Sequence, residues 1–384
     1  MIQPCPLIEV EGPPHERGLQ YGRLGGERIQ LGAARYLEQL KRDAFDADAL
    51  QQAVQRLLPV MAGFDALYMD EMRGIAEGAD CPFEHIVLLN ARTELLQLAR
   101  RQRAAGAPDH EDDPDGCTGV VVLPAAARDG RLIHAQNWDW KAECADTAVV
   151  LKVHGIDGAP DFMTFTEAGG LARCGMNAAG IAITANYLEC DRDYQQLGVP
   201  LALFRRKVLE QRRLAHALRA VYCTPKSASN NMMVSHAEGV VVNFECAPDE
   251  TFLVQAQDGL LVHANHWLSP VALGKLRDTG IDSTPDSLYR DQRVRGLLSA
   301  LGRPISRADV KAALFDSFEG DWAVCRPPRP SLRNNLSATV AMIVMEPATG
   351  TMDVAMLPAL NRSFQRFTLD STFVPTAAIS LHED

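Results

Sequence analysis

The stretch Asp115-Gly116-Cys117-Thr118 ends an acidic loop and leads directly into the apolar run Gly119-Val120-Val121-Val122-Leu123. Glycine has no Cβ, so Gly116 tolerates strained backbone angles and lets a neighbouring sulfur approach its carbonyl carbon. Attack by the Cys117 thiol would give a thioester, and hydrolysis of that thioester would free the α-amino group of Cys117. The sequence therefore predicts a bond at which the chain cuts itself and leaves a cysteine at the start of a strand.

The freed amine would give Cys117 its own general base. An α-amino group has a reference pKa of about 7.7–8.0 and a thiol one of about 8.5, so both titrate near neutral pH. Enzymes with an N-terminal threonine use the same arrangement, and cysteine is the more nucleophilic variant. We predict that Cys117 is the catalytic nucleophile; the alternative for a Gly-Cys pair is a buried structural cysteine.

Length, composition and charge limit the classes of protein to which the chain can belong. With 384 residues, 47% hydrophobic and 23% charged, the chain is long enough to bury a large core in one or two domains. A net charge of −11 without a basic stripe argues against nucleic acid as a partner. No apolar run reaches membrane-spanning length, and charged residues interrupt the first twenty positions. We therefore expect a cytoplasmic protein that has no membrane partner.

The cysteines and histidines do not form a metal motif. The nine cysteines are scattered singly and no two have the Cys-x-x-Cys spacing of a zinc or redox site. We expect most of them to be reduced and buried, and we expect no metal and no organic cofactor.

Periodicity predicts helices first and strands afterwards. A short strand at 6–11 precedes helical patterns up to residue 100, including Met69–Ala79 and Ile86–Leu98. The polar stretch 101–116 is predicted to be a linker. Short β-branched runs then predict strands, interrupted by helices at 199–212 and 214–223, and by a second pair at 286–301 and 306–318 whose latter member opens with the capping box Ser306-x-x-Asp309. The expected strands are 119–123, 132–138, 147–154, 161–166, 180–188, 231–245, 251–255, 259–264, 338–346 and 351–357. This order favours an α+β arrangement of antiparallel sheets covered by helices.

Polar residues within apolar segments are candidates for a site around Cys117. Asn90, Arg92 and Glu94 lie among leucines, where a solvated helix face is the alternative. Asp139 follows a predicted strand and would hold the freed ammonium or steer its proton. Asn265 would donate into an oxyanion hole, a role that typically lowers the barrier by about 3–4 kcal/mol. For Asp139 and Asn265 the alternative is an ordinary turn residue.

Collinear motifs over nearly the whole chain resemble the acyl-coenzyme A:6-aminopenicillanic acid acyltransferase family, a group of self-processing N-terminal-nucleophile hydrolases that includes isopenicillin N acyltransferase. The motifs are Met72-Arg73-Gly74-Ile75-Ala76-Glu77-Gly78-Ala79, Leu89-Asn90-Ala91-Arg92-Thr93-Glu94, Asp115-Gly116-Cys117-Thr118, Gln136-Asn137-Trp138-Asp139, Thr166-Glu167-Ala168-Gly169, Gly175-Met176-Asn177-Ala178-Ala179-Gly180, Gly198-Val199-Pro200, Val262-His263-Ala264-Asn265-His266 and Pro285-Asp286-Ser287.

The resemblance implies a four-layer αββα fold and cleavage between Gly116 and Cys117. Residues 1–116 would form a small, mainly helical subunit that stays bound to a catalytic subunit of residues 117–384, the two together making one structural domain. Carried over by motif, Cys117 is the nucleophile, its amine the base, Asp139 the orienting carboxylate and Asn265 the oxyanion donor. Candidates for substrate contact or support are Asn90, Arg92, Glu94, Asn137, Glu167 and His263, with Arg333 and Asn335 from a stretch that aligns poorly.

The predicted reaction is acyl transfer at the carbon–nitrogen bond of a small N-acyl amide through a Cys117 thioester. Water or a second amine resolves the acyl-enzyme, and the sequence slightly favours hydrolysis over an acyl-CoA-dependent N-acyltransferase of the penicillin-forming type. Acyl-CoA would then be a co-substrate. Two rivals stay open: a Cys-His peptidase that uses His134, His263 or His266, and an uncleaved binding or scaffold protein.

Overall fold

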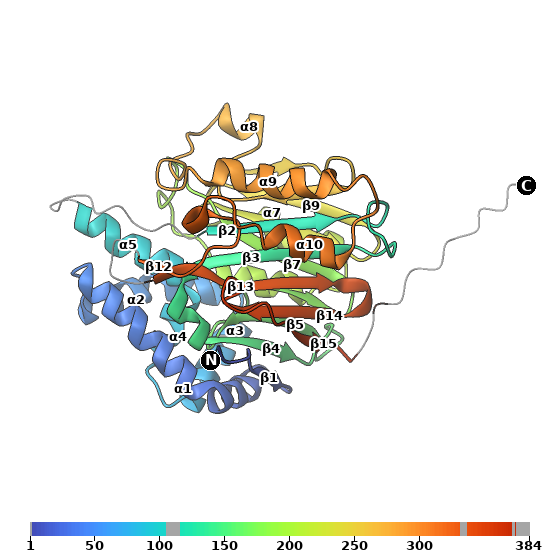
Figure 1. Cartoon of the computed structure of the whole chain (residues 1–384). Coiled ribbons are helices and arrows are strands. Elements are labelled where there is room, and N and C mark those ends of the chain that lie inside the picture. Colours follow the sequence, from blue (N-terminus) through green and yellow to red (C-terminus); the bar gives the residue numbers. More distant parts are fainter. Residues whose placement is uncertain (1, 105–115, 331–335, 371–372, 374–384) are drawn as a thin grey trace, which may run out of the picture.

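Two sheets form the centre of the structure (Figure 1). The computed structural model describes residues 2–104, 116–330, 336–370 and 373. The larger sheet has eight strands, all antiparallel to their neighbours except β1, which pairs in parallel with β4. In spatial order these strands are β1 (Leu7–Val10), β4 (Ala148–Val153), β5 (Phe162–Glu167), β6 (Cys174–Asn177), β7 (Ile181–Tyr187), β8 (Asn230–His236), β9 (Val240–Cys246) and β10 (Thr251–Val254).

The second sheet has seven strands and carries Cys117. All of its strand pairs are antiparallel. β12 lies outside the linear order of the other six strands and pairs with β13. The strands are β11 (Leu260–His263), β2 (Gly116–Val122), β3 (Ile133–Lys141), β13 (Leu336–Glu346), β14 (Thr351–Met356), β15 (Gln365–Thr368) and β12 (Arg329–Pro330).

Helices cover the outer faces of both sheets. Those that precede Cys117 are α1 (Pro14–Arg42), α2 (Ala47–Phe64), α3 (Ala66–Gly78), α4 (Phe83–Asn90) and α5 (Arg92–Ala104). Those that follow it are α6 (Leu201–Leu209), α7 (Leu214–Cys223), α8 (Pro270–Leu273), α9 (Ser287–Ser299) and α10 (Arg307–Leu314), with short 3-10 turns η1 (Ala142–Asp146), η2 (Gly320–Trp322) and η3 (Pro347–Thr349).

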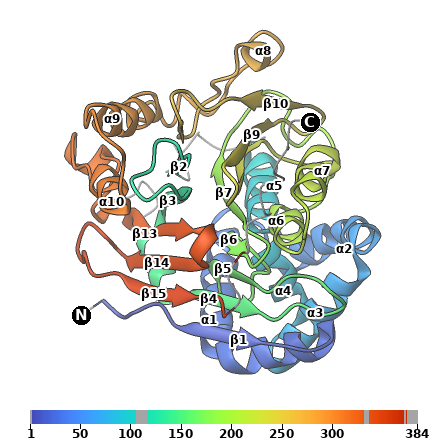
Figure 2. The same cartoon turned by 90° about the vertical axis from the view of Figure 1, so that its right-hand side faces the viewer.

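The layers follow the predicted αββα order. Helices α6 and α7 pack on β6 to β9, strands β2 and β3 face β7 of the other sheet, and α9 and α10 pack on β11, β2, β3 and β13. Figure 2 shows α9 and α10 on one side of the paired sheets and α6 and α7 on the other. The predicted α+β class and four-layer arrangement are confirmed.

Close helix packing and a buried ionic cluster fasten the N-terminal helices. A Cβ at Gly18 would lie 2.1 Å from the carbonyl oxygen of Glu71, and one at Gly74 would lie 2.2 Å from that of His15, so α1 and α3 touch along their backbones. The Glu71 carboxylate, 1% exposed, accepts hydrogen bonds from Arg206 on α6 at 3.0 and 3.1 Å and from Arg17 on α1 at 2.7 Å. Glu71 therefore ties the segment before Cys117 to the segment after it.

Most predicted elements are confirmed within a few residues, and two are wrong. The pattern Ile86–Leu98 is two helices, because the chain turns at Ala91. The side chain of Asn90 bonds to Ile86 O and Gly169 O at that turn. The pattern 231–245 is a hairpin of β8 and β9, turned at Gly239 with φ +88°. Strands β6 and β15 were not predicted as separate elements, whereas the capping box at Ser306 is confirmed.

Among the described residues, no helix combines the length and apolar character needed to cross a bilayer. Most of the predicted linker, residues 105–115, lies outside the described ranges.

Candidate active site

Cys117 is the second residue of β2 and is 1% exposed. Its backbone N–H donates to Asn265 Oδ1 at 2.8 Å, and its carbonyl oxygen accepts from Arg290 Nη1 at 2.8 Å. Cys117 lies directly opposite Trp138 on β3, so both side chains project from the same face of the sheet. The Trp138 ring meets Phe165 of the other sheet at a centroid distance of 5.7 Å, which places this face between the sheets. The backbone of Cys117 is thus held at both its nitrogen and its oxygen.

Asn265, just beyond β11, has an amide whose orientation its neighbours fix. Its Oδ1 accepts from two donors, Cys117 N and Arg290 Nη2 at 2.8 Å, while its Nδ2 donates to Tyr187 O at 2.9 Å. An amide nitrogen has two hydrogens, so one bond leaves Nδ2 with a second donor. The predicted oxyanion donor therefore lies beside Cys117 with donor capacity remaining.

Asp139 lies on β3 directly opposite Gly116. Because side chains alternate along a strand, its carboxylate projects from the face opposite to that of the Cys117 thiol. Its Oδ1 accepts from Thr339 Oγ1 at 2.6 Å, and its Oδ2 lies 3.5 Å from Arg326 Nε. Burial raises the pKa of Asp139, against the opposing effect of Arg326 and Arg290. The carboxylate is therefore beside the Gly116–Cys117 peptide rather than beside the sulfur.

Arg290 and Arg326 are site residues that the sequence analysis missed. Both are fully buried, and both bond to Asp286, Arg290 through Nε at 2.7 Å and Arg326 through Nη2. Burial alone would raise the pKa of Asp286, but the two arginines outweigh it and hold that pKa below its ordinary value. The motif Pro285-Asp286-Ser287 pointed to this region, and Arg290 lies one helical turn further along α9.

The Gly116–Cys117 peptide lies against a buried donor and a buried acceptor that have no hydrogen-bond partner among the described residues. These are Arg326 Nη1 and Asp139 Oδ2. A Cβ at Gly116 would lie 2.8 Å from that nitrogen and 2.9 Å from that oxygen. Buried polar atoms usually have hydrogen-bond partners, so these two atoms leave hydrogen-bonding capacity beside the Gly116–Cys117 peptide.

Four of the predicted support residues form a polar layer on the N-terminal side of the site. Asn90 also accepts from Leu171 N at 2.8 Å, and so holds the loop after β5. Arg92 pairs with Glu167 at 2.9 Å, and both contact the Tyr36 hydroxyl. Glu94 accepts from Leu201 N at the start of α6 at 3.0 Å. Burial raises the pKa of Glu94 to about 7.

Asn137 and the candidate histidines hold structural positions. Asn137 Nδ2 donates to Leu314 O and Val324 O, which fastens α10 to the sheet. His134 bonds to Ser235 and Thr184, each at 2.8 Å. His263 bonds to Glu245 at 2.8 Å and to Ala264 O at 2.9 Å, while His266 bonds to Ser287 Oγ at 2.7 Å. With both ring nitrogens bonded to other groups, His134 and His263 have none left for a Cys-His pair. The candidates Arg333 and Asn335 lie outside the described residues.

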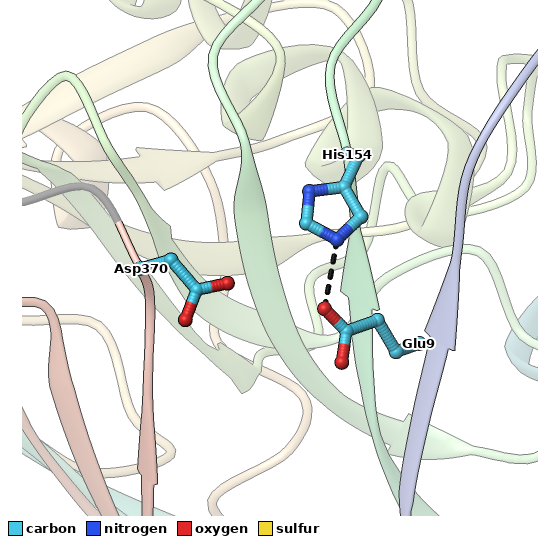
Figure 3. A group of neighbouring side chains, drawn as sticks. All are labelled: Glu9, His154 and Asp370. Atoms are coloured by element: carbon cyan, nitrogen blue, oxygen red, sulfur yellow. Dashed lines mark hydrogen bonds and ion pairs between the residues drawn. The ribbon is translucent and has the colours of Figure 1, made fainter.

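One group of side chains has the spacing of metal ligands. Ligand atoms of Glu9, His154 and Asp370 lie within 4.8 Å of one another, and Figure 3 shows the bond from His154 to Glu9. The Lys152 ammonium contacts both carboxylates, at 2.9 Å from Glu9. Because Lys152 already supplies the positive charge there, the group is better described as an ionic cluster that joins β1, β4 and the segment after β15.

The fold and the site define an αββα protein with a cysteine at the start of a central strand, held by an amide and flanked by a carboxylate and two arginines. Residues 126–357 match the family model described as acyl-coenzyme A:6-aminopenicillanic acid acyl-transferase. The chain belongs to this family, and it is accordingly an enzyme. The matched stretch includes Asp139, Asn265, Arg290 and Arg326 and begins after Cys117.

The chain is also similar to individual proteins. The chain is 29% identical over 300 residues to the acyl-coenzyme A:6-aminopenicillanic-acid-acyltransferase 40 kDa form of Emericella nidulans, covering 76% of this chain and 77% of that protein. It is 22% identical over 328 residues to an uncharacterized protein of Archaeoglobus fulgidus, covering 76% of this chain and 54% of that one. A solved structure, a Caenorhabditis elegans N-acylethanolamine-hydrolyzing acid amidase ortholog, covers 60% of this chain and is itself 92% covered, with 19% identity and a TM-score of 0.41, a value too low to bear on the site.

Proposed function

We propose that the protein is a self-processing enzyme that cleaves the carbon–nitrogen bond of a small N-acyl amide and forms a thioester on Cys117. The observation that carries this proposal is the position of the Gly116–Cys117 peptide between Asn265, Asp139 and Arg326. The nitrogen that now donates to Asn265 would become the α-amino group of a mature N-terminus.

Processing would begin with attack of the Cys117 sulfur on the Gly116 carbonyl carbon. The bond between that carbon and the Cys117 nitrogen breaks, the nitrogen takes a proton, and water hydrolyses the resulting thioester. Arg326 Nη1 has no hydrogen-bond partner among the described residues and lies beside Gly116, so we propose that its guanidinium would stabilise negative charge that develops on the Gly116 carbonyl oxygen.

Turnover would follow the same sequence of bonds. The thiolate attacks the substrate carbonyl, the second Nδ2 hydrogen of Asn265 supports the oxyanion, and the Cys117 amine protonates the departing amine. Asp139 would hold that amine in its charged state and orient it. Water or a second amine then takes the acyl group. Transfer to an amine is the alternative reaction, because the Emericella nidulans relative is named as an acyltransferase.

The experiment is intact-mass measurement of the purified protein beside a Cys117→Ala variant under denaturing conditions. We expect two fragments in the first, the heavier one beginning at Cys117, and a single chain of 42.0 kDa in the second. One unprocessed mass in both would overturn the self-processing mechanism. Incubating the processed protein with an N-acyl amide, with and without an added amine, then separates free acid from transferred amide.

A further inference from the structure

A cavity of about 150 Å³ lies between α2, α5 and the loop that joins β7 to α6. Neither Cys117 nor Asn265 lines it, so it is separate from the candidate active site. A cavity of this volume with apolar walls can hold a molecule as large as benzene. The apolar part of the wall consists of Ala53, Leu57, Leu95, Leu98 and Leu197.

Tyr194 lines the cavity, and its hydroxyl oxygen is buried without a hydrogen-bond partner among the described residues. The rest of Tyr194 is held in place. Its backbone N–H donates to Ser227 O at 2.7 Å, and the Arg101 guanidinium lies 4.7 Å from the centroid of its ring. Its φ of +61° is a conformation that bulky residues rarely adopt. Because a buried hydroxyl without a partner costs stability, this fixed position indicates a ligand that supplies the partner.

Glu94 brings an acidic group to the same cavity. Its side chain is buried, and Oε1 accepts a hydrogen bond from Leu201 N at 3.0 Å. Burial raises the pKa of Glu94 to about 7, although that bond, Arg205 and Arg92 act in the opposite direction. These neighbours therefore compensate the negative charge only in part. Arg56, the other charged residue that lines the cavity, is exposed, so water screens its charge.

The charges around the Tyr194 hydroxyl are mainly negative. Burial raises the pKa of this hydroxyl well above its ordinary value, and the carboxylates of Glu94, Asp193 and Glu189 raise it further. Arg100 acts in the opposite direction and has a smaller effect than any of the three carboxylates. A positively charged group beside the Tyr194 hydroxyl would therefore be stabilised.

We propose that this cavity binds a small primary amine, with the ammonium group between the Glu94 carboxylate and the Tyr194 hydroxyl and the apolar part of the molecule against the leucines. An ammonium group has three donors, so it can bond to the carboxylate and to the hydroxyl oxygen at the same time. It would compensate the charge of Glu94 and give the Tyr194 hydroxyl its partner. The site does not rest on the proposed function, because it is separate from Cys117.

Calorimetric titration of the purified protein with benzylamine tests the site. Benzylamine joins an ammonium group to a single benzene ring, and benzyl alcohol is a neutral analogue of the same size. We expect benzylamine to bind with about tenfold higher affinity than benzyl alcohol, because a hydrogen bond between charged groups is stronger than one between neutral groups. Absence of benzylamine binding, or equal affinities for the two compounds, would overturn the proposal.

Two conservative variants locate the bound amine. Glu94→Gln keeps a side-chain acceptor oxygen and removes the charge, whereas Tyr194→Phe removes only the hydroxyl. Each should weaken benzylamine binding about tenfold. Tyr194→Phe should not lower the melting temperature, because the hydroxyl has no partner in the described part of the chain. Glu27→Gln on α1 and Tyr222→Phe on α7 change exposed residues and should bind benzylamine as the wild-type protein does. Undiminished binding in Glu94→Gln would place the amine elsewhere and overturn the site.

Proton release provides a readout that a purely structural role of Glu94 would not affect. At pH 7 about half of the Glu94 carboxyl groups carry a proton, which the ammonium group would displace. Binding should therefore release about half a proton, measured from binding enthalpies in buffers of different ionisation enthalpy. The affinity should rise about tenfold from pH 6 to pH 8, because Glu94 ionises while the amine stays charged. Glu94→Gln should remove both effects. A wild-type affinity that stays constant over this range would contradict the proposed contact.

Discussion

Gly116 and Asp139 face each other across β2 and β3 so closely that a single methyl group at position 116 would lie 2.9 Å from the Asp139 carboxylate. Such a distance is shorter than carbon–oxygen contact, so the strand or the carboxylate must shift. Because Asp139 and Arg326 are both fixed and buried, the shift falls on the peptide that is to be cut.

We therefore predict that Gly116→Ala slows processing at least tenfold, measured as the appearance of the fragment that begins at Cys117. The matched control is Gly63→Ala in α2, where an added Cβ has nothing within 4 Å. That change should leave processing unaltered and stabilise the fold by about 0.5–1 kcal/mol, because glycine is a poor helix former. A Gly116→Ala variant that is processed at the wild-type rate would contradict the prediction that a Cβ at position 116 hinders cleavage.

Removal of Arg326 should destabilise the protein as well as slow processing. Arg326→Met leaves Asp139 and Asp286 buried without the cation between them, which typically costs about 3–5 kcal/mol. Urea unfolding of this variant in a Cys117→Ala background measures the stability term apart from cleavage. Arg219→Gln, an exposed arginine, should change stability by no more than about 0.5 kcal/mol. Equal effects of the two substitutions would contradict the buried cluster.

Two acidic residues on α3 provide a matched pair. Glu71→Ala leaves Arg17 and Arg206 without their shared carboxylate, and we expect a loss of about 3–5 kcal/mol in the free energy of unfolding. Asp70 forms an exposed pair with Arg73 at 2.8 Å, so Asp70→Ala should cost less than about 1 kcal/mol. Urea unfolding in the Cys117→Ala background compares them, and similar midpoints would show that Glu71 does not fasten the N-terminal helices.

The ionic cluster at His154 predicts a pH dependence of stability. Partial burial would lower the pKa of His154, but its hydrogen bonds to Glu9 and Asp161 outweigh this and raise it above its ordinary value of 6.5. The bonds from Lys152 and His154 lower the pKa of Glu9 below its ordinary 4.5. The contribution of His154 is complete below pH 6.5 and disappears as the pH rises through its raised pKa, whereas that of Glu9 disappears in acid.

The expected result is a melting temperature that falls from about pH 6 to pH 9 in the wild-type protein and falls less in His154→Gln. His216→Gln, at an exposed position on α7, is the control and should follow the wild-type curve. Melting temperatures that run in parallel for all three proteins would show that the charge of His154 does not contribute.

The sequence was informative where a function depends on a local pattern. A glycine before a cysteine that opens a strand, and polar residues at strand ends, located Gly116, Cys117, Asp139 and Asn265, and the structure places these four together. The layered fold followed from strands in runs and helices in pairs. The break at Ala91 could not be predicted, because the apolar pattern continues through it. Two of the bonds that hold Asn90 at the break go to Gly169 and Leu171, which are distant in sequence.

Arg326 was missed for a different reason. Arg326 lies in a proline-rich stretch without periodicity, and its carboxylate partners are 187 and 40 positions away in sequence, at Asp139 and Asp286. Burial and ion pairs between distant residues are properties of the folded chain. Site residues that are recognised by these properties can therefore be found only in the structure.

The parallel pairing of β1 with β4 has a consequence for the mature protein. Leu7–Val10 is an edge strand of the larger sheet, and with Glu71 it belongs to the segment that cleavage would separate from the rest. A sheet completed by a second chain is governed by mass action. The melting temperature of the cleaved protein should therefore rise with its concentration, whereas that of the Cys117→Ala precursor should not. Cleavage of one peptide bond would thus make the stability of the enzyme depend on dilution.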